Sequence, residues 1–414
     1  MNIYDWLDNE FNNSILSSTG FTQLIATKPC IISSSECLNA GNRLKVIHDF
    51  QDRCIRLFRY ALRENDEELL NWLINETPSS LGVDYHKKLL DWHFTRPVFF
   101  RTDEMQFGKI AEIQCPGSHW GELELLYRFF KRMGSTSTLT APSVLFTKQL
   151  KEYLGDIQPI VHYLVDNASA PTGVRYFISK TRPTIKYWGI DSGVSLLDCN
   201  FIRSHSFFGL CAENYFKIRL KESQPTFKYD FPPYVLFDQK ATLVLPFWSK
   251  TRKFFNDEIR NLIIYSTPLL SETIELENGE NVTIRDFSNR LPSQRAYYLK
   301  YAGSDVSMNW GSRTVYRLSN ETAQSCEKLL QKCLNGAQNG QSWLLQKEVV
   351  SKCEPEYWDR TGSKKVEKMH VKYSAFYGPF DLIGMSSYYR KHFKVHGQND
   401  TVQSLVVPEG NGEM

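Results

Sequence analysis

The sequence predicts an α/β fold, more closely an α+β fold, divided into several structural units. Three observations predict it. The 414 residues are enough for two or three units that share cores. Hydrophobic residues make up 42% of the chain and aromatic residues 14%, which is enough for large cores and argues against disorder. Stretches with apolar residues at helical spacing alternate with short apolar runs typical of strands.

Four regions are expected along the chain. The first is mostly helical, because apolar residues recur at helical spacing between Val46 and Leu62 and again around Leu69 to Leu73. The second starts with two strands joined by a turn at Gly108 and ends in a helix. The third is a small α/β unit and the fourth a mixed region with several strands. The boundaries are 1–95, 96–135, 136–235 and 236–407.

Within these regions the pattern predicts individual elements. Strands are expected at 97–103 and 109–114, and the small α/β unit is expected to contain strands at 160–165 and 174–178. Residues 236–255 are predicted to form a loop followed by a helix. The remaining expected elements are a strand at 296–300, a helix at 321–334, a strand at 342–346 and antiparallel strands in the last 45 residues.

Charge and cysteine content predict a cytoplasmic protein. The formal net charge of +3 is too small to indicate a nucleic-acid or membrane surface. The first residues are acidic and amphipathic, unlike a signal peptide, and no stretch has the ~18 to 20 apolar residues of a membrane span. The nine cysteines are scattered without a CxxC pair, which is typical of reduced thiols. We expect no nucleic-acid and no membrane partner.

A glycine- and serine-containing loop after an apolar strand is the most informative segment. Lys300 closes the strand at 296–300, and the loop that follows contains small residues. Glycines let backbone N–H groups turn toward an anion, and a lysine at the entrance of the loop supplies a positive charge. Such a loop can cover the phosphates of a nucleotide, although GxxxxGK[ST] is absent and an ordinary hairpin turn is the alternative. The small residues are Gly303, Ser304, Ser307 and Gly311.

Two neighbouring strands carry polar residues at alternate positions. Residues i and i+2 of a strand face the same side, so Glu112 and Gln114 can present two oxygens to one Mg²⁺. Arg101 and Asp103 have the same spacing on the preceding strand. A surface strand with alternating polar residues is the alternative explanation.

Three further segments offer groups for an anion or a nucleotide. Lys240 precedes an expected helix, where a positive charge is easier to explain if it faces an anion, although a solvated lysine explains it too. A strand that ends after Gln346 can offer backbone groups to an adenine edge. Arg390 can bind a carboxylate through two parallel hydrogen bonds.

In their order, these segments resemble the ATP-grasp ligases, in particular the circularly permuted branch that includes eukaryotic-type glutathione synthetases and glutathionylspermidine synthetases. In that branch a metal-binding Glu-x-Asn strand, with an Arg-x-Asp strand before it, precedes the nucleotide lid. Residues 101–103 and 112–114 hold those places here, and Ser118 stands where the family has small residues that face the substrate. Two departures are Gln114 in place of the Asn and Asn309-Trp310 within the lid.

The resemblance implies an ATP-grasp fold, in which two α+β subdomains clasp a nucleotide. It implies ATP and Mg²⁺ as cofactors, with the metal-binding strands in 96–135 and the lid and core in 236–407. The implied metal ligands are Glu112, Gln114 and Asp305. The implied ATP contacts are Lys240, Lys300, Gly303, Ser304, Ser307, Gly311, Gln346, Glu348 and Lys394. The implied substrate contacts are Arg101, Asp103, Ser118 and Arg390, of which Arg101 and Arg390 also act with Lys300 in catalysis.

The implied activity is that of an ATP- and Mg²⁺-dependent ligase, which joins a small-molecule or peptide carboxylate to an amine or thiol through an acyl phosphate. One alternative is a non-catalytic ATP-grasp-like module that binds nucleotide and regulates a partner, which the Gln114 departure favours. Another is a hydrolase with Cys115 as nucleophile and His119 as its base, because the turn after Cys115 can expose a thiol.

Overall fold

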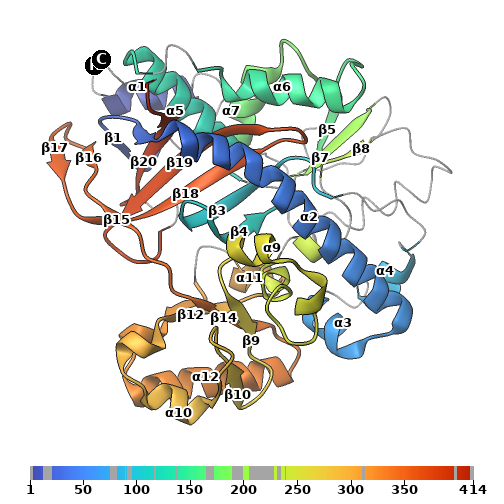
Figure 1. Cartoon of the computed structure of the whole chain (residues 1–414). Helices are drawn as coiled ribbons and strands as arrows, with labels where there is room; N and C mark the ends of the chain where they lie inside the picture. Colours follow the sequence, from blue (N-terminus) through green and yellow to red (C-terminus); the bar gives the residue numbers. More distant parts are fainter. Residues whose placement is uncertain are drawn as a thin grey trace.

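The computed structural model shows a mixed α+β protein whose described residues form one large mixed sheet and three smaller sheets (Figure 1). It describes the chain except for residues 1–2, 13–20, 75–81, 89, 91–95, 116–117, 136–138, 165–171, 189–198, 205–227, 231–234, 238, 310–312, 396–398 and 411–414. The predicted α+β class is confirmed. Within the described part of the chain, no helix has the length and apolar character that crossing a membrane requires.

Strands from both ends of the chain form the large sheet. Its order is β17-β16-β1-β20-β19-β18-β3-β4, with β2 beside β20 and β15 beside β18. The two N-terminal strands run parallel to β20, and the pairs among β3, β4, β18, β19 and β20 are antiparallel. The strands are β1 Leu24–Ala26, β2 Cys30–Ile32, β3 Phe100–Gln106, β4 Lys109–Gln114, β15 Lys352–Cys353, β16 Glu356–Trp358, β17 Lys364–Val366, β18 Met369–Tyr377, β19 Leu382–Arg390 and β20 Val402–Pro408.

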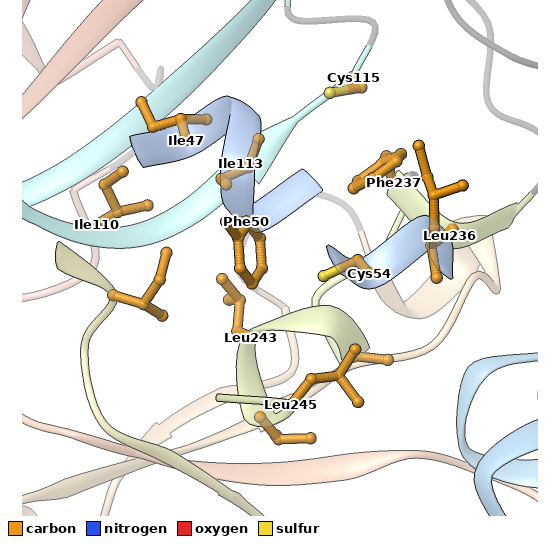
Figure 2. Packing of buried hydrophobic residues seen from close by; sticks show 14 of the residues in the cluster. Ile47, Phe50, Cys54, Ile110, Ile113, Cys115, Leu236, Phe237, Leu243 and Leu245 are labelled. Atoms are coloured by element: carbon orange, nitrogen blue, oxygen red, sulfur yellow. The ribbon is translucent and has the colours of Figure 1, made fainter. Parts of the chain in front are cut away.

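One face of this sheet is covered by the long helix α2 (Ser34–Glu64). Ser33 caps the helix in a capping box with Glu36, and Asn65 ends it in the left-handed conformation. Apolar side chains of α2 pack against β4 and the segment around 235–245, as Figure 2 shows. The neighbouring short helices are α3 Glu67–Leu73, α4 Val83–Lys88 and α9 Asp257–Leu262.

Helices pack on part of the opposite face. There α5 (Trp120–Arg132) contacts β19 and β20, and its buried side chains share a core with Phe99, Phe376 and Leu405 of the sheet region. The remaining helices of this layer are α1 Ile3–Asn12, α6 Pro142–Tyr153 and α7 Thr172–Thr181. The part of this face around Arg101 and Asp103 carries polar side chains instead.

A small parallel sheet lies within residues 160–229, in the order β6-β5-β7-β8. The prediction of a strand at 174–178 was wrong, because these residues belong to α7. Val174 and Ile178 are one helical turn apart and pack together on Tyr163, which a helix explains and a strand does not. The strands are β5 Ile160–Leu164, β6 Lys186–Trp188, β7 Phe201–Ser204 and β8 Lys228–Tyr229.

The fourth region contains an antiparallel sheet of order β13-β12-β14-β9, which packs on α12 and has its own core. The strands predicted at 296–300 and 342–346, the helix at 321–334 and the antiparallel C-terminal strands are confirmed. The helix predicted within 236–255 is wrong, since only short 3-10 turns occur there. The elements are η2 Val235–Phe237, η3 Ala241–Val244, η4 Arg252–Phe254, β9 Ser266–Pro268, β10 Thr273–Glu275, β11 Asn281–Thr283, α10 Ile284–Asn289, η5 Pro292–Arg295, β12 Tyr297–Tyr301, α11 Val306–Asn309, β13 Val315–Arg317, η6 Leu318–Asn320, α12 Ala323–Gln338 and β14 Trp343–Lys347.

Candidate functional site

The large sheet and the β12–β14 sheet meet where β14 approaches β4. The Gln346 side chain on β14 donates hydrogen bonds from Nε2 to the Ala111 carbonyl of β4 at 3.2 Å and to Ser266 Oγ at 3.1 Å. Its Oε1 accepts a hydrogen bond of 2.6 Å from Lys300 Nζ. Gln346 therefore fixes the lysine at the junction of the two sheets.

A second lysine reaches the same junction from the turn before η3. The Lys240 backbone N–H donates to the Ala302 carbonyl just after β12, at 3.1 Å. The Lys240 ammonium lies 3.1 Å from Glu112 Oε1 on β4. Burial lowers the pKa of Lys300 to about 8, Glu112 raises it and Lys240 lowers it, so the three charges are close enough to interact. The structure thus brings together both lysines and the glutamate that the sequence singled out.

Asp103 is the centre of a buried network on β3. It lies opposite Glu112 in the sheet, and Arg101 lies opposite Gln114, so the four side chains share one face. Arg101 donates two hydrogen bonds to the Asp103 carboxylate, at 2.9 and 3.2 Å. Burial by itself raises the pKa of Asp103, but Arg101 and Lys372 outweigh burial and hold this pKa well below its usual range. The carboxylate is therefore ionised and positions the arginine.

Arg101 also connects the network to the loop before α5. Its NH1 group donates to the carbonyl and to the hydroxyl of Ser118, both at 2.9 Å. The Ser118 hydroxyl donates in turn to Gln114 Oε1 at 3.3 Å. Hydrogen bonds thus link Ser118 to both Arg101 and Gln114.

The loop after β12 contains the predicted lid residues. Gly303 is buried, Ser304 is half-buried, and the short helix α11 follows them. The Asp305 carboxylate accepts a hydrogen bond of 2.8 Å from the Ser307 backbone N–H. Within the described residues, no hydrogen bond or ion pair joins Asp305 to Glu112 or Gln114. Gly311 lies outside the described residues.

The remaining predicted residues gather at the other end of β19. Arg390 donates from Nε to both oxygens of Asp400, at 2.8 and 2.9 Å. Glu348 pairs with Arg317, and the Lys394 ammonium lies 5.9 Å from the centre of the Tyr316 ring. Arg390 is four positions from Ser386, or about 13 Å along the strand, whereas Ser386 is in line with Asp103 across β18. The predicted substrate contacts therefore fall in two places.

The structure separates Cys115 from His119, which were weighed as a nucleophile and its base. The Cys115 side chain is 3% exposed and packs in the apolar core beneath the sheet, where Figure 2 shows it near Ile113 and Phe237. The His119 ring lies 6.0 Å from the Tyr388 ring, which belongs to the opposite face of the sheet. The described surroundings of the two side chains therefore do not favour a nucleophile–base pair.

Sequence reasoning missed Lys372, which donates a hydrogen bond of 2.8 Å to Asp103 Oδ2. Its strand follows Arg101 and Asp103 by about 270 residues, and only the pairing of β3 with β18 brings the strands together. The alternation of polar residues at 370, 372 and 374 was the one available signal.

The comparisons with known proteins give a match in fold. No family model matches the chain, and no curated protein sequence matches it. The fold is similar to that of a glutathione synthetase-like effector from Globodera pallida in its apo form, with a TM-score of 0.54 and 12% identity over 98% of this chain and 97% of that chain. At this identity the likeness is one of fold alone. A provisionally named gamma-glutamylcysteine synthetase from Methylobacillus flagellatus aligns over 88% of this chain and 87% of its own, with 9% identity and a TM-score of 0.39.

Proposed function

We propose that the protein is an ATP- and Mg²⁺-dependent ligase of the ATP-grasp type, which joins a carboxylate to an amine or thiol through an acyl phosphate. The observation that carries the proposal is the meeting of Lys240, Lys300 and Glu112 at the junction of the two sheets. The glutathione synthetase-like fold supports it.

The nucleotide would lie between the sheets. The adenine would contact the strand end at Gln346 and Glu348, and the phosphates would lie at Lys240 and Lys300. Lys300 is half-buried and is already held in place by Gln346, so it loses little freedom when it binds a phosphate. The loop at 303–311 would close over the phosphates with its backbone N–H groups and exclude water from the acyl phosphate.

The donors on β4 fit Mg²⁺. Glu112 and Gln114 offer a carboxylate and an amide oxygen on one face, and hard cations of this kind bind oxygen ligands while keeping several waters. Asp305 would add a third oxygen when the loop closes. When bound, the ion neutralises charge on the ATP phosphates. Lys240, now paired with Glu112, would then be released to contact a phosphate.

The substrate carboxylate would attack the γ-phosphorus of ATP, with ADP as the leaving group. Lys240 and Lys300 would stabilise the negative charge that moves from the γ- to the β-phosphate. Arg101 would line the carboxylate site and is held rigidly by Asp103 and Ser118. At Arg390 a carboxylate would have to compete with Asp400.

A non-catalytic nucleotide-binding module is the second candidate. It is favoured by one observation, namely that both oxygen donors on β4 are engaged within the chain: Glu112 by Lys240 and Gln114 by Ser118. An ADP-release assay with Mg²⁺ and ATP, run against a panel of amino acids and amines, decides between the two. A ligase releases ADP only when a suitable pair is present. Stabilisation by Mg²⁺ and ATP without ADP release for any pair would favour the module.

A further inference from the structure

Buried polar groups without hydrogen-bond partners lie beside the Arg101–Asp103 network. Tyr388 on β19 and Gln403 on β20 are paired in the sheet and are 2% and 0% exposed. The Gln403 side chain has no partner for its Nε2 or its Oε1, and the Tyr388 hydroxyl has none beyond its neighbour Ser386. Leaving such groups unpaired destabilises a folded chain, so they point to a ligand that pairs with them.

The start of α5 faces Tyr388. The His119 ring lies 6.0 Å from the Tyr388 ring, and its Nδ1 is 3.5 Å from Glu122 Oε1 and has no hydrogen-bond partner. His119 has a φ of +71°, a left-handed backbone conformation that residues other than glycine rarely adopt. A histidine with a carboxylate beside it is a common general base, whose ring nitrogen accepts a proton from the reacting group.

The position of this helix start is fixed by a close crossing. A Cβ atom on Gly121 would lie 2.0 Å from the carbonyl oxygen of Gly173 on α7, so the helices approach at a distance that only glycine permits. The start of α5, and with it His119, is therefore held in one place relative to α7, and an acid–base group needs such a fixed position.

Lys372 connects this group to the network at Asp103. Its ammonium lies 5.0 Å from the centre of the Tyr388 ring and 2.8 Å from Asp103 Oδ2. Lys372 and Asp103 thus connect Tyr388 to Arg101, which donates to the same Asp103 carboxylate. A molecule bound at Tyr388 would lie near Arg101, which lines the proposed carboxylate site.

We propose that His119, Glu122, Tyr388 and Gln403 form the acceptor site of the ligase, and that His119 takes the proton from the attacking amine; this inference rests on the proposed function. The amine nitrogen attacks the carbonyl carbon of the acyl phosphate, and a C–N bond forms. The C–O bond to phosphate breaks, and inorganic phosphate leaves with the electron pair. The amine proton passes to His119, whose imidazolium Glu122 stabilises.

The same side chains define the class of acceptor. The Gln403 amide offers one donor group and one acceptor atom side by side, and its complement is another amide. Tyr388 adds a hydroxyl that donates or accepts. The acceptor site therefore takes an amine that also carries an amide group, such as an amino-acid amide or a small peptide.

The role of His119 is tested by comparing two nucleophiles. N-acetylated amino acids serve as carboxylate donors, and glycinamide or hydroxylamine as the nucleophile, with ADP release as the readout. His119→Asn keeps a residue type that tolerates the left-handed backbone and removes the base. The rate with glycinamide should fall about a hundredfold or more. The rate with hydroxylamine, which is unprotonated at neutral pH and needs no base, should stay within about threefold. Equal losses with both nucleophiles, or no loss, would overturn the role of His119.

The role of Gln403 is tested with a matched control. Gln51 on α2 is also fully buried with both amide atoms unpartnered, and it belongs to the helix on the other face of the sheet. Gln51→Leu and Gln403→Leu should both raise the melting temperature, because each removes unpaired polar atoms. Only Gln403→Leu should abolish the preference for glycinamide over ethylamine. A preference that survives Gln403→Leu would overturn the acceptor site alone. If the wild-type protein releases no ADP with any donor, the proposed function fails and the acceptor site fails with it.

Discussion

Lys300 and Gln346 are 46 residues apart, and they share a hydrogen bond of 2.6 Å that links two strands of one sheet to the edge of another. The lysine belongs to β12, and the glutamine to β14, whose side chain also reaches the backbone of β4. This hydrogen bond holds the Lys300 ammonium at the junction of the two sheets. It also explains why the properties of the lysine depend on Glu112 and Lys240, which come from two further segments.

Nucleotide affinity should fall as the pH rises through about 8. Burial lowers the pKa of Lys300 to about 8, and only the charged form attracts phosphate. At pH 9 the dissociation constant for ATP should be about tenfold higher than at pH 7. Lys300→Arg should show no such rise, because a guanidinium stays protonated throughout this range. Calorimetric titration between pH 7 and pH 9.5 measures both, and equal slopes for the two proteins would refute the assignment.

The same pKa predicts the sign of a stability change. Between pH 8 and 10.5 the unfolded chain keeps the Lys300 proton while the folded chain has lost it, so this group makes the free energy of unfolding rise with pH in that interval. Removing the charge by Lys300→Met should flatten this part of the profile in denaturant titrations.

Glu112→Ala should abolish ATP turnover and remove the effect of Mg²⁺ on the ATP-induced rise in melting temperature. Glu112 lies within the edge strand β4 and is partly exposed, with 27% of its side chain accessible, so the fold should persist. Gln114→Asn keeps the amide oxygen on a side chain that is one methylene shorter and should retain or raise activity. Circular dichroism checks the fold, and a Glu112→Ala protein with near-normal turnover would show that the metal assignment is wrong.

Asp230→Asn should destabilise the small parallel sheet. Arg203 NH1 lies 2.6 Å from Asp230 Oδ2, and the two side chains are 2% and 0% exposed. Removing one charge leaves the guanidinium buried among aromatic rings without its counter-ion, which costs about 3 to 5 kcal/mol. Thermal melting measures the loss. The pair of Lys365 and Asp359 is the control, because 49% of the lysine side chain is exposed, and Lys365→Met should leave the melting temperature unchanged.

Much of the fold could be predicted from local patterns. The long helix α2, the strands β3, β4, β12 and β14 and the helix α12 each show their own periodicity in the sequence. The N-terminal strands β1 and β2 were missed because they have three residues each, and their partner β20 lies more than 370 residues away. Such pairing leaves no local signal.

The site was only partly predictable for the same reason. Glu112, Gln114, Arg101 and Asp103 were found because alternation along a strand is visible in the sequence. The partners that fix them, such as Lys372, come from distant strands. His119 was noticed for its nearness to Cys115 in sequence, yet Cys115 packs in the core beside α2 whereas His119 lies beside Tyr388 at the start of α5. A shift of one residue along a strand moves a side chain to the other face of the sheet. The direction of a residue that follows the strand in a loop cannot be read from this alternation.

The most direct test of the ligase assignment is an ATP titration of Lys300→Met with Mg²⁺ present, beside Lys347→Met as a matched control. Lys347 is on the neighbouring strand, is 44% exposed and pairs with Glu277 at the surface. A lost charge-assisted contact to phosphate is typically worth ~1.5 to 3 kcal/mol. Lys300→Met should therefore raise the dissociation constant for ATP roughly tenfold to a hundredfold or lower the turnover rate by as much, while Lys347→Met changes neither. An unchanged dissociation constant together with an unchanged turnover rate in Lys300→Met would contradict the account.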